Sequence, residues 1–296
     1  MELKCVFCGS ADLSHSRSRR SVEYRGDQSF YRCRSCLGFV LLPPLSEVEI
    51  ASMYTHKYID EVNMDLDIEQ ISSGSRFVDL FAFLDHKMQT RENVSYLDYG
   101  CGADAETLIF AKKIGYIAQG VELTQSAREE AGSCSGCDVL SPSELFKSNL
   151  KFDTIFLGDV IEHIYNPIEI LTLLKPHLKP GGEVFIQGPL EGASTFSHFL
   201  LAIKSYFTPG RRSHLPPYHV SLANFNAISL LLAASGYRID WYRTAEPIWP
   251  AKRFFSKGSL DSISDFIFSF SKVVDISISK IVRHYGTRIY LVAKLK

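Results

Sequence analysis

The pattern of apolar and polar positions changes along the chain. Residues 1 to about 42 have few periodic apolar positions, whereas residues 77–88 repeat apolar side chains at helical spacing. Beyond them, short apolar runs alternate with amphipathic segments. The stretch "LLPPLSE" marks a boundary, because paired prolines continue neither a helix nor a central strand. The pattern therefore predicts a small N-terminal module followed by a large α/β domain.

The alternation in the large domain predicts a parallel sheet. Five strands are expected, in "VSYLDYG", "IAQGVEL", "CDVL", "FDTIFLGDV" and "GGEVFIQGP". Helical segments are expected at 104–114, from about Gln125, and in "NPIEILTLLKPHL". Strands separated by helices of this length form parallel sheets with right-handed crossovers. Two further strands, "YRIDWYRT" and "RIYLVAKLK", are separated by a long segment and need not follow the parallel rule.

Composition narrows the classes of protein. The chain has 296 residues, of which 46% are hydrophobic, enough for one large globular domain beside a small module. Its net charge of −1 argues against broad nucleic-acid binding, which needs a basic surface. The N-terminus "MELKCVFCGS" lacks the apolar core of a secretory signal, and no apolar run approaches the ~20 residues of a membrane span. Seven cysteines without such a signal indicate a reducing compartment, so we expect a cytoplasmic protein.

Four cysteines of the N-terminal module form two C-x-x-C pairs. Cys5 and Cys8 lie in "CVFCG", and Cys33 and Cys36 lie in "CRSCLG". Two such pairs supply the four soft ligands of a closed tetrahedral zinc site, and a segment this short needs a staple. The zinc is expected to be structural, because four cysteines leave no open position. The alternative is two unrelated pairs or a redox dithiol.

The stretch "YLDYGCGADA" joins a strand end to a helix through a glycine turn. Gly100, Gly102 and Ala105 fit G-x-G-x-x-[GA], a pattern that usually cradles a dinucleotide pyrophosphate. Asp98 and Asp104, however, would bring like charge close to a pyrophosphate. S-adenosylmethionine carries a sulfonium and an ammonium and no phosphate, so nearby carboxylates help it bind. The turn therefore favours S-adenosylmethionine, with an NAD-dependent oxidoreductase as the alternative enzyme.

A third carboxylate, Glu122, ends the second strand in "GVELT". A carboxylate there accepts both ribose hydroxyls of a nucleoside. NAD and S-adenosylmethionine share that ribose, so Glu122 predicts a nucleoside-containing cofactor without separating the two.

These stretches together resemble the class I S-adenosylmethionine-dependent methyltransferases. "LDYGCG", "GVEL", "FDTIFLGDVIEHIYNP" and "LLKPHLKPGGEVFIQGP" occur in that order over residues 90–190. "YRCRSCLGFVLLPPLSEVEIASMYTHKY" resembles the zinc ribbon and tyrosine-bearing linker helix of a subgroup often encoded with polysaccharide or natural-product pathways. The resemblance implies an α/β fold, a Rossmann-like seven-stranded sheet whose last strand is antiparallel, with a small N-terminal zinc ribbon.

The resemblance also implies a division of the chain and a set of cofactor contacts. It implies a zinc ribbon at 1–42, linker helices at 43–90, and a methyltransferase domain at 91–296 with a substrate-loop insertion at 190–220 and a C-terminal helix at 260–285. Cofactor contacts are expected from Tyr54, Tyr58, Asp98, Gly100, Gly102, Glu122, Leu123 and Asp159. Sugar C-methyltransferases with this ribbon carry a further C-terminal domain, for which the chain stops too soon. We therefore expect an oxygen or nitrogen acceptor on a small molecule, sugar or glycan.

The run "GDVIEHI" follows the fourth strand, where open α/β sheets place their sites. Asp159, Glu162 and His163 are spaced so that a helical turn would put them on one side. Methyl transfer to a hydroxyl needs removal of a proton, which suits His163, with His219 in "PPYHV" as the reserve base. Ubiquinone-pathway O-methyltransferases have a similar run associated with a divalent cation, so Mg²⁺ is a second hypothesis. Alternatively, Glu162 and His163 only brace the cofactor loop.

Several alternatives stay open. Arg211 and Arg212 in the insertion are suited to hold an anionic group, or belong to a solvated loop. The apolar face of helix 260–285 suits packing on the domain, a dimer contact, or a lipid-linked substrate. An RNA methyltransferase that holds RNA with the arginines of its ribbon, and a non-catalytic protein that keeps the cofactor fold, are the alternative functions. The oligomeric state is left open.

Overall fold

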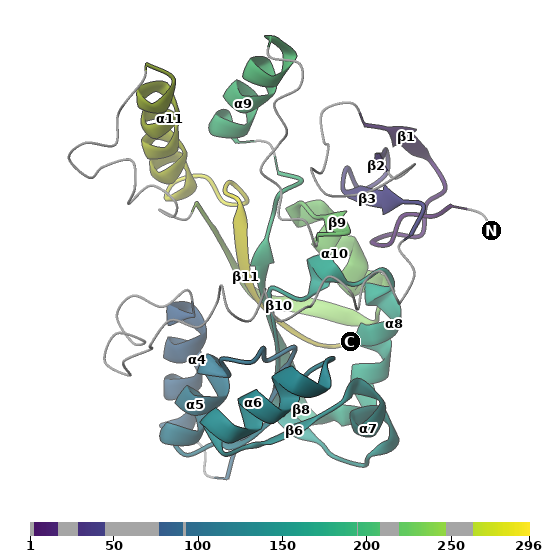
Figure 1. Cartoon of the computed structure of the whole chain (residues 1–296), viewed down its shortest axis with the longest axis vertical. Helices are drawn as coiled ribbons and strands as arrows, with labels where there is room; N and C mark the ends of the chain where they lie inside the picture. The colour runs from purple at the N-terminus through teal and green to yellow at the C-terminus, as the bar shows by residue number, and fades with distance from the viewer. Residues whose placement is uncertain are drawn as a thin grey trace.

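Two sheets organise the chain in the computed structural model shown in Figure 1. The structure describes residues 3–16, 29–44, 77–90, 93–193, 195–207, 219–246 and 263–296. The expected tyrosines Tyr54 and Tyr58, the arginines Arg211 and Arg212, and most of the linker at 43–90 lie outside these residues.

The larger sheet has seven strands in the order β10-β11-β8-β7-β4-β5-β6. The strands that run parallel are β4 (Ser95–Tyr99), β5 (Ile117–Val121), β6 (Asp138–Leu140), β7 (Phe152–Gly158) and β8 (Leu178–Pro189). The last strand, β11 (Arg288–Leu295), lies antiparallel between β8 and β10 (Tyr237–Ala245). The fold class predicted from the sequence is therefore confirmed. The strand order reverses at β4, which places a ligand crevice at the carboxyl ends of β4 and β7.

Helices cover both faces of this sheet, and each face has its own apolar core. One core joins the sheet to α4 (Val78–Met88), α5 (Glu106–Lys113) and α6 (Gln125–Ser135). The other joins it to α7 (Pro142–Lys147), α8 (Pro167–Leu174) and α10 (Phe225–Ala234). Neighbouring positions such as Tyr96 and Leu97 belong to opposite cores, as the alternation of side chains along a strand requires.

One helix starts later than the sequence predicts, and another helix was not predicted. The helix expected at 104–114 begins at Glu106, because Ala105 adopts a left-handed conformation with φ of 46°. Helix α7 was not predicted, although Ser141 and Glu144 form a capping box at its start.

The N-terminal module, formed by residues 3–16 and 29–44, is a small antiparallel sheet. Its strands are β1 (Leu13–His15), β2 (Ser29–Cys33) and β3 (Phe39–Leu42). A fourth strand, β9 (Ser221–Leu222), comes from the large domain and pairs antiparallel with β3. The sequence analysis did not predict β9, because two residues carry no periodicity.

Helices α9 (Phe196–Phe207) and α11 (Ile263–Ser279) contact each other near the top of Figure 1. Asp275 of α11 is buried and accepts the backbone N–H groups of Phe196 and Ser197, each over 2.9 Å. Phe270, by contrast, is 60% exposed. At this point α11 docks on the domain through polar bonds, and the dimer contact that the sequence left open for its apolar side stays a prediction. Among the described residues, no helix combines the length and apolar character needed to cross a bilayer.

Candidate functional site

The glycine turn lies at the carboxyl end of β4 and touches the segment that follows β7. Gly100 and Gly102 have φ of 86° and 67°, a region that L side chains rarely adopt. A Cβ atom on Gly100 would lie only 2.6 Å from Cγ2 of Val160. Glycine is therefore required at position 100 both by backbone conformation and by the close approach of the neighbouring segment.

Glu122 sits against this turn, at the end of β5. One carboxylate oxygen accepts the N–H of Gly102 over 3.1 Å, and the other accepts the N–H of Leu123 over 2.6 Å. Each oxygen retains a lone pair for a further donor. Leu123, the next residue, is 54% exposed and offers an apolar surface beside the carboxylate.

Asp98 is buried, and its carboxylate accepts the hydroxyl of Thr107 in α5. Burial raises the pKa of the nearby Cys101 thiol, and the charge of Asp98 adds to that effect. Cys101 therefore stays protonated and is no nucleophile. The side chain of Asp98 braces the start of α5, and its expected contact with a cofactor stays a prediction.

The segment after β7 brings Asp159 toward the last strand of the sheet. Asp159 has a φ of 55° and donates its N–H to the carbonyl oxygen of Gln187 over 2.8 Å. Its carboxylate accepts from Nη2 of Arg288 over 2.7 Å. Strained backbone of this kind persists where neighbours hold it and is common at functional sites. The role of Arg288 was not predicted from the sequence, because "RIYLVAKLK" indicated only a strand.

Glu162 is buried in the short helix Ile161–His163. Within the described part of the chain, its Oε1 atom has no hydrogen-bond partner. Burial, and to a lesser degree the charge of Asp159, raises the pKa of Glu162 from 4.5 to about 8. The carboxyl group is therefore largely protonated at neutral pH and available to a ligand.

His219 is held by a carboxylate that the sequence analysis missed. Its Nδ1 atom lies 2.6 Å from Oε2 of Glu191. Burial alone lowers the pKa of His219, but the hydrogen bond and charge of Glu191 outweigh burial and raise it above 6.5. The ring of His163 lies edge-on to that of His219, with 4.8 Å between centroids. Glu191 was missed because it falls in "GPLEGA", which carries no motif.

The structure brings together Glu162, His163 and His219, whose candidate ligand atoms all lie within 4.8 Å of one another. Asp159, which the sequence spacing grouped with Glu162 and His163, is instead paired with Arg288. The intervening turn is a 3₁₀ helix that starts after a left-handed residue, so the helical spacing assumed from the sequence does not apply. A pocket opens beside Glu162, lined also by Gln187, Gly188, Ser221, Ala223 and Ile289.

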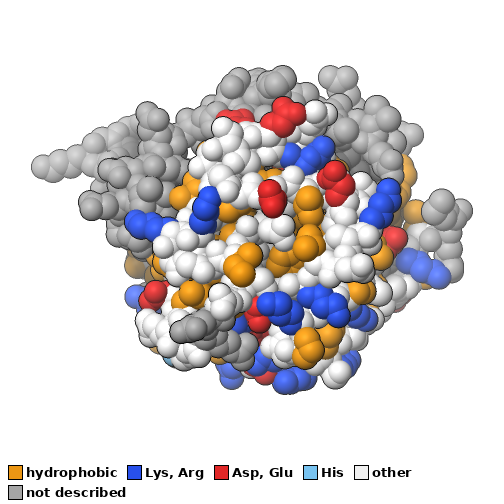
Figure 2. All heavy atoms as spheres, turned by 90° about the horizontal axis from the view of Figure 1, so that it is seen from below, with side chains coloured by type: hydrophobic (Ala, Val, Ile, Leu, Met, Phe, Trp, Pro, Cys, Tyr) orange, Lys and Arg blue, Asp and Glu red, His pale blue; other side chains and the backbone are white. Residues whose placement is uncertain are grey.

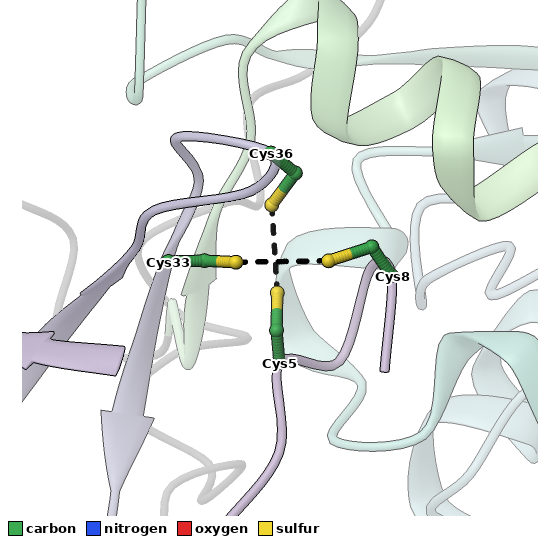
Figure 3. Close-up of side chains that lie close together, drawn as sticks. All are labelled: Cys5, Cys8, Cys33 and Cys36. Atoms are coloured by element: carbon green, nitrogen blue, oxygen red, sulfur yellow. Dashed lines mark hydrogen bonds between the residues drawn. The ribbon is translucent and has the colours of Figure 1, made fainter. Parts of the chain in front are cut away.

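The four cysteines of the N-terminal module converge on a common point (Figure 3). The sulfur atoms of Cys5 and Cys36 lie 3.5 Å apart, and those of Cys8 and Cys33 lie 3.6 Å apart. Disulfides need about 2.05 Å, so these are separate thiols. A tetrahedral zinc ion about 2.3 Å from each sulfur requires about 3.8 Å between sulfurs, close to the observed separations. The cluster is compatible with a small zinc ribbon.

Comparison with known proteins identifies the family. A family model described as a methyltransferase domain matches residues 72–240. This match spans more than half of the chain, and the chain therefore belongs to the family of S-adenosylmethionine-dependent methyltransferase domains. A search of curated proteins found no match.

One solved structure supports this fold. The chain is similar to the magnesium protoporphyrin IX methyltransferase of Synechocystis, solved with bound S-adenosylhomocysteine, with a TM-score of 0.54 and 12% identity over 85% of this chain and 100% of that chain. It is also similar to an S-adenosylmethionine-dependent methyltransferase from Archaeoglobus fulgidus, with a TM-score of 0.48 and 18% identity over 81% of this chain and 100% of that one. At such identities the likeness concerns the fold alone.

Proposed function

We propose that this chain transfers the methyl group of S-adenosylmethionine to an oxygen or nitrogen atom of a small-molecule or glycan acceptor. The observation that carries the proposal is the pairing of His219 with Glu191 beside the buried Glu162. Glu162 lies two residues after Val160, whose side chain lies beside Gly100 of the glycine turn. A cofactor on the turn and an acceptor at the histidines would therefore be neighbours.

The glycine-turn side binds the cofactor. Glu122 accepts the ribose hydroxyls with the lone pairs that Gly102 and Leu123 leave open. Leu123 covers the adenine with its exposed apolar side chain. Gly100 and Gly102 let the backbone approach the methionine part closely. Asp98 holds the turn and α5 in place, and its negative charge favours a cationic ligand over a pyrophosphate.

The histidine side prepares the acceptor. S-adenosylmethionine, when bound, supplies an activated methyl group, so the acceptor needs only placement and removal of a proton. Because Glu191 engages Nδ1 of His219, it favours the tautomer whose Nε2 accepts that proton. The same bond orients the imidazole of His219 for this role, since an oriented base loses less entropy. Glu162, protonated near neutral pH, donates a hydrogen bond to another oxygen atom of the acceptor molecule.

Binding and turnover together test this function. Calorimetry is expected to show binding of S-adenosylhomocysteine and none of NAD. Incubation with methyl-labelled S-adenosylmethionine and fractionated metabolites is then expected to label an acceptor. Tight NAD binding would reverse the cofactor assignment. Cofactor binding without any labelled product would favour the non-catalytic alternative.

A metal ion held by Glu162, His163 and His219 is the second candidate for activating the acceptor. Their ligand atoms converge, and two imidazoles with one carboxylate suit a transition metal better than Mg²⁺. Added Co²⁺ would then produce visible absorption that is lost in His163→Ala, and a chelator would abolish turnover. A zinc assay must accompany the chelator, so that loss of zinc from the N-terminal module is recognised. Full activity in metal-free buffer with intact module zinc would exclude this candidate.

Zinc is the metal proposed for Cys5, Cys8, Cys33 and Cys36, with a structural role. Four thiolates close the coordination sphere and leave no position for a substrate. Metal analysis of freshly purified, reduced protein is expected to find about one zinc per chain. A finding of no metal would leave the module with a cluster of free thiols.

The RNA alternative receives less support. Four of the ribbon arginines on which it rests lie outside the described residues: Arg17, Arg19, Arg20 and Arg25. Of the two described ones, Arg34 faces Asp12 at 3.8 Å, and the guanidinium of Arg32 lies 5.7 Å from the ring centroid of Phe39. On the large domain, the face seen from below in Figure 2 carries acidic, basic and apolar side chains interspersed with one another. RNA binding needs a continuous basic surface and would appear as a salt-dependent gel shift.

A further inference from the structure

One segment of chain contacts both the N-terminal module and the histidine cluster, which consists of Glu162, His163 and His219. Val220, the residue after His219, donates its N–H to the carbonyl oxygen of Glu162 over 2.8 Å. The carbonyl oxygen of Val220 accepts the N–H of Leu41, in β3, also over 2.8 Å. The next two residues, 221 and 222, then pair with β3. One residue therefore joins the cysteine-bearing module to the segment that holds Glu162.

Side-chain packing repeats this connection. An apolar cluster of buried residues fills the space between β2, β3 and β9, with Tyr165 packed against it: Phe30, Phe39, Leu41, Val220 and Leu222. Tyr165 follows His163 by two residues. The cluster thus contacts the chain just after each of the two histidines.

The cysteine turn itself is fastened to the large domain. The carbonyl oxygen of Cys36 accepts from Nδ2 of Asn224 over 3.0 Å and from Nδ2 of Asn226 over 3.3 Å. The Oδ1 atom of Asn224 caps α10 by accepting the N–H of Ala227 over 2.9 Å. A metal held by the cysteines would therefore fix the start of α10 and the segment just before it.

The partner of His219 is attached to the same segment. Gly192, next to Glu191, donates its N–H to the carbonyl oxygen of Ala223 over 2.8 Å. A Cβ atom on Gly192 would lie only 2.7 Å from the carbonyl oxygen of Leu222, so the two stretches of backbone are in close contact. Residues 219–223 thus carry His219 and contact the segments that hold Glu162 and Glu191. The same residues also pair with β3 of the N-terminal module.

We propose that the metal-loaded N-terminal module is a positioning element of the acceptor site, which holds His219 against Glu191 through β3 and β9. The proposal rests on the proposed role of His219 but is tested without catalysis. Loss of the metal loosens β3, which leaves β9 unpaired and opens the contact between His219 and Glu191. The glycine turn keeps its bonds to Val121 and Glu122, so cofactor binding persists.

Chemical footprinting of the histidines tests this coupling. The zinc-loaded chain and the chain stripped with a chelator are treated with diethyl pyrocarbonate, and each modified histidine is quantified by mass spectrometry. His219, only 8% exposed, is expected to react about tenfold faster or more after zinc removal, as for a locally opened segment. His177, buried and bonded to the carbonyl oxygen of Leu150 over 2.8 Å, is the internal control and should stay protected.

Calorimetry on the same samples completes the test. The affinity for S-adenosylhomocysteine is expected to change by less than about threefold on zinc removal, because the bonds around Glu122 are kept. An unchanged rate at His219 would overturn the proposal. Equal exposure of His177, or loss of cofactor binding, would overturn it too, because the module would then support the whole fold. If His219 proves dispensable for turnover, its proposed role as the base is wrong. The coupling between the module and the His219–Glu191 contact would still hold.

A second pair of variants avoids the cysteines. Leu222→Asp places a charge in the apolar cluster between β3 and β9, and Leu230→Asp places one at a 36% exposed position of α10. Only Leu222→Asp should raise the reactivity of His219, with zinc content and His177 protection retained. Equal effects of the two variants would argue against the proposed route.

Discussion

The glycine-turn side and the histidine side of the crevice are built in different ways. The turn side uses backbone N–H groups and one carboxylate from a short stretch of chain, from Asp98 to Leu123. The histidine side assembles Glu162, Glu191 and His219 from distant segments and buries Glu162 and His219. The backbone N–H groups of the turn hold Glu122 through local bonds, whereas buried titratable side chains depend on everything that surrounds them. Cofactor binding and turnover should therefore be separable by mutation.

The largest expected effect separates the two histidines. His219→Ala removes the oriented base, and turnover with saturating cofactor should fall by roughly 10²–10⁴-fold while S-adenosylhomocysteine affinity stays nearly unchanged. His163→Ala, the matched control, should lose much less. In the wild type, turnover should rise with pH through a value above 6.5, because the base must be deprotonated and its pKa is raised. Normal turnover by His219→Ala would return the role to His163.

A substitution in the glycine turn is expected to lower cofactor affinity rather than turnover at saturating cofactor. Gly100→Ala combines a strained φ with a contact of 2.6 Å to Val160, so affinity for S-adenosylhomocysteine should fall on the order of 100-fold. Gly181→Ala is the control, because Gly181 has a φ of 73° with no atom near the added Cβ. It should lose about 1–2 kcal/mol of stability and no affinity. Comparable affinities in the two variants would mean that neither the strain nor the contact at Gly100 affects cofactor binding.

A smaller effect is expected at Glu122. Glu122→Ala should weaken binding of S-adenosylhomocysteine by about 1–3 kcal/mol, the loss of charge-assisted hydrogen bonds to the ribose. Turnover at saturating cofactor should change little, since the histidine side is untouched. Glu129→Ala removes an exposed carboxylate of α6 and serves as the control in the same titration. Undiminished affinity in Glu122→Ala would show that the carboxylate does not reach the ribose.

The smallest effect concerns the pH dependence of stability. The folded chain keeps a proton on Glu162 between its ordinary pKa of 4.5 and its raised value of about 8. The free energy of unfolding should therefore decrease as pH rises through this window, to which His219 adds a change of the same sign. Urea titrations from pH 5.5 to 8.5 should show a larger decrease in the free energy of unfolding for the wild type than for Glu162→Gln. Parallel profiles would mean that Glu162 titrates normally.

The same contrast explains what the sequence could predict. The seven strands and the glycine turn follow from apolar runs and local spacing, and the position of Glu122 follows from the end of its strand. Glu191 and Arg288 could not be predicted, because their roles arise from pairing with His219 and Asp159 across the fold. The ion pair of Asp159 with Arg288 could not be predicted either, because a left-handed residue before a 3₁₀ turn replaces the helical turn that the spacing suggested.

The pairing of β3 with β9 also constrains the order of folding. Residues 39–40 find their partners only at 221–222, so the N-terminal sheet stays incomplete until most of the large domain has been synthesised. Pairings of such long sequence separation form late and leave an edge exposed meanwhile. Expression of residues 91–296 alone would uncover the apolar surface of Leu222 and Ala227 that the module covers. The boundary at residue 90 that the sequence suggests is therefore a poor place to cut the protein, and a soluble fragment is more readily obtained by keeping both parts together.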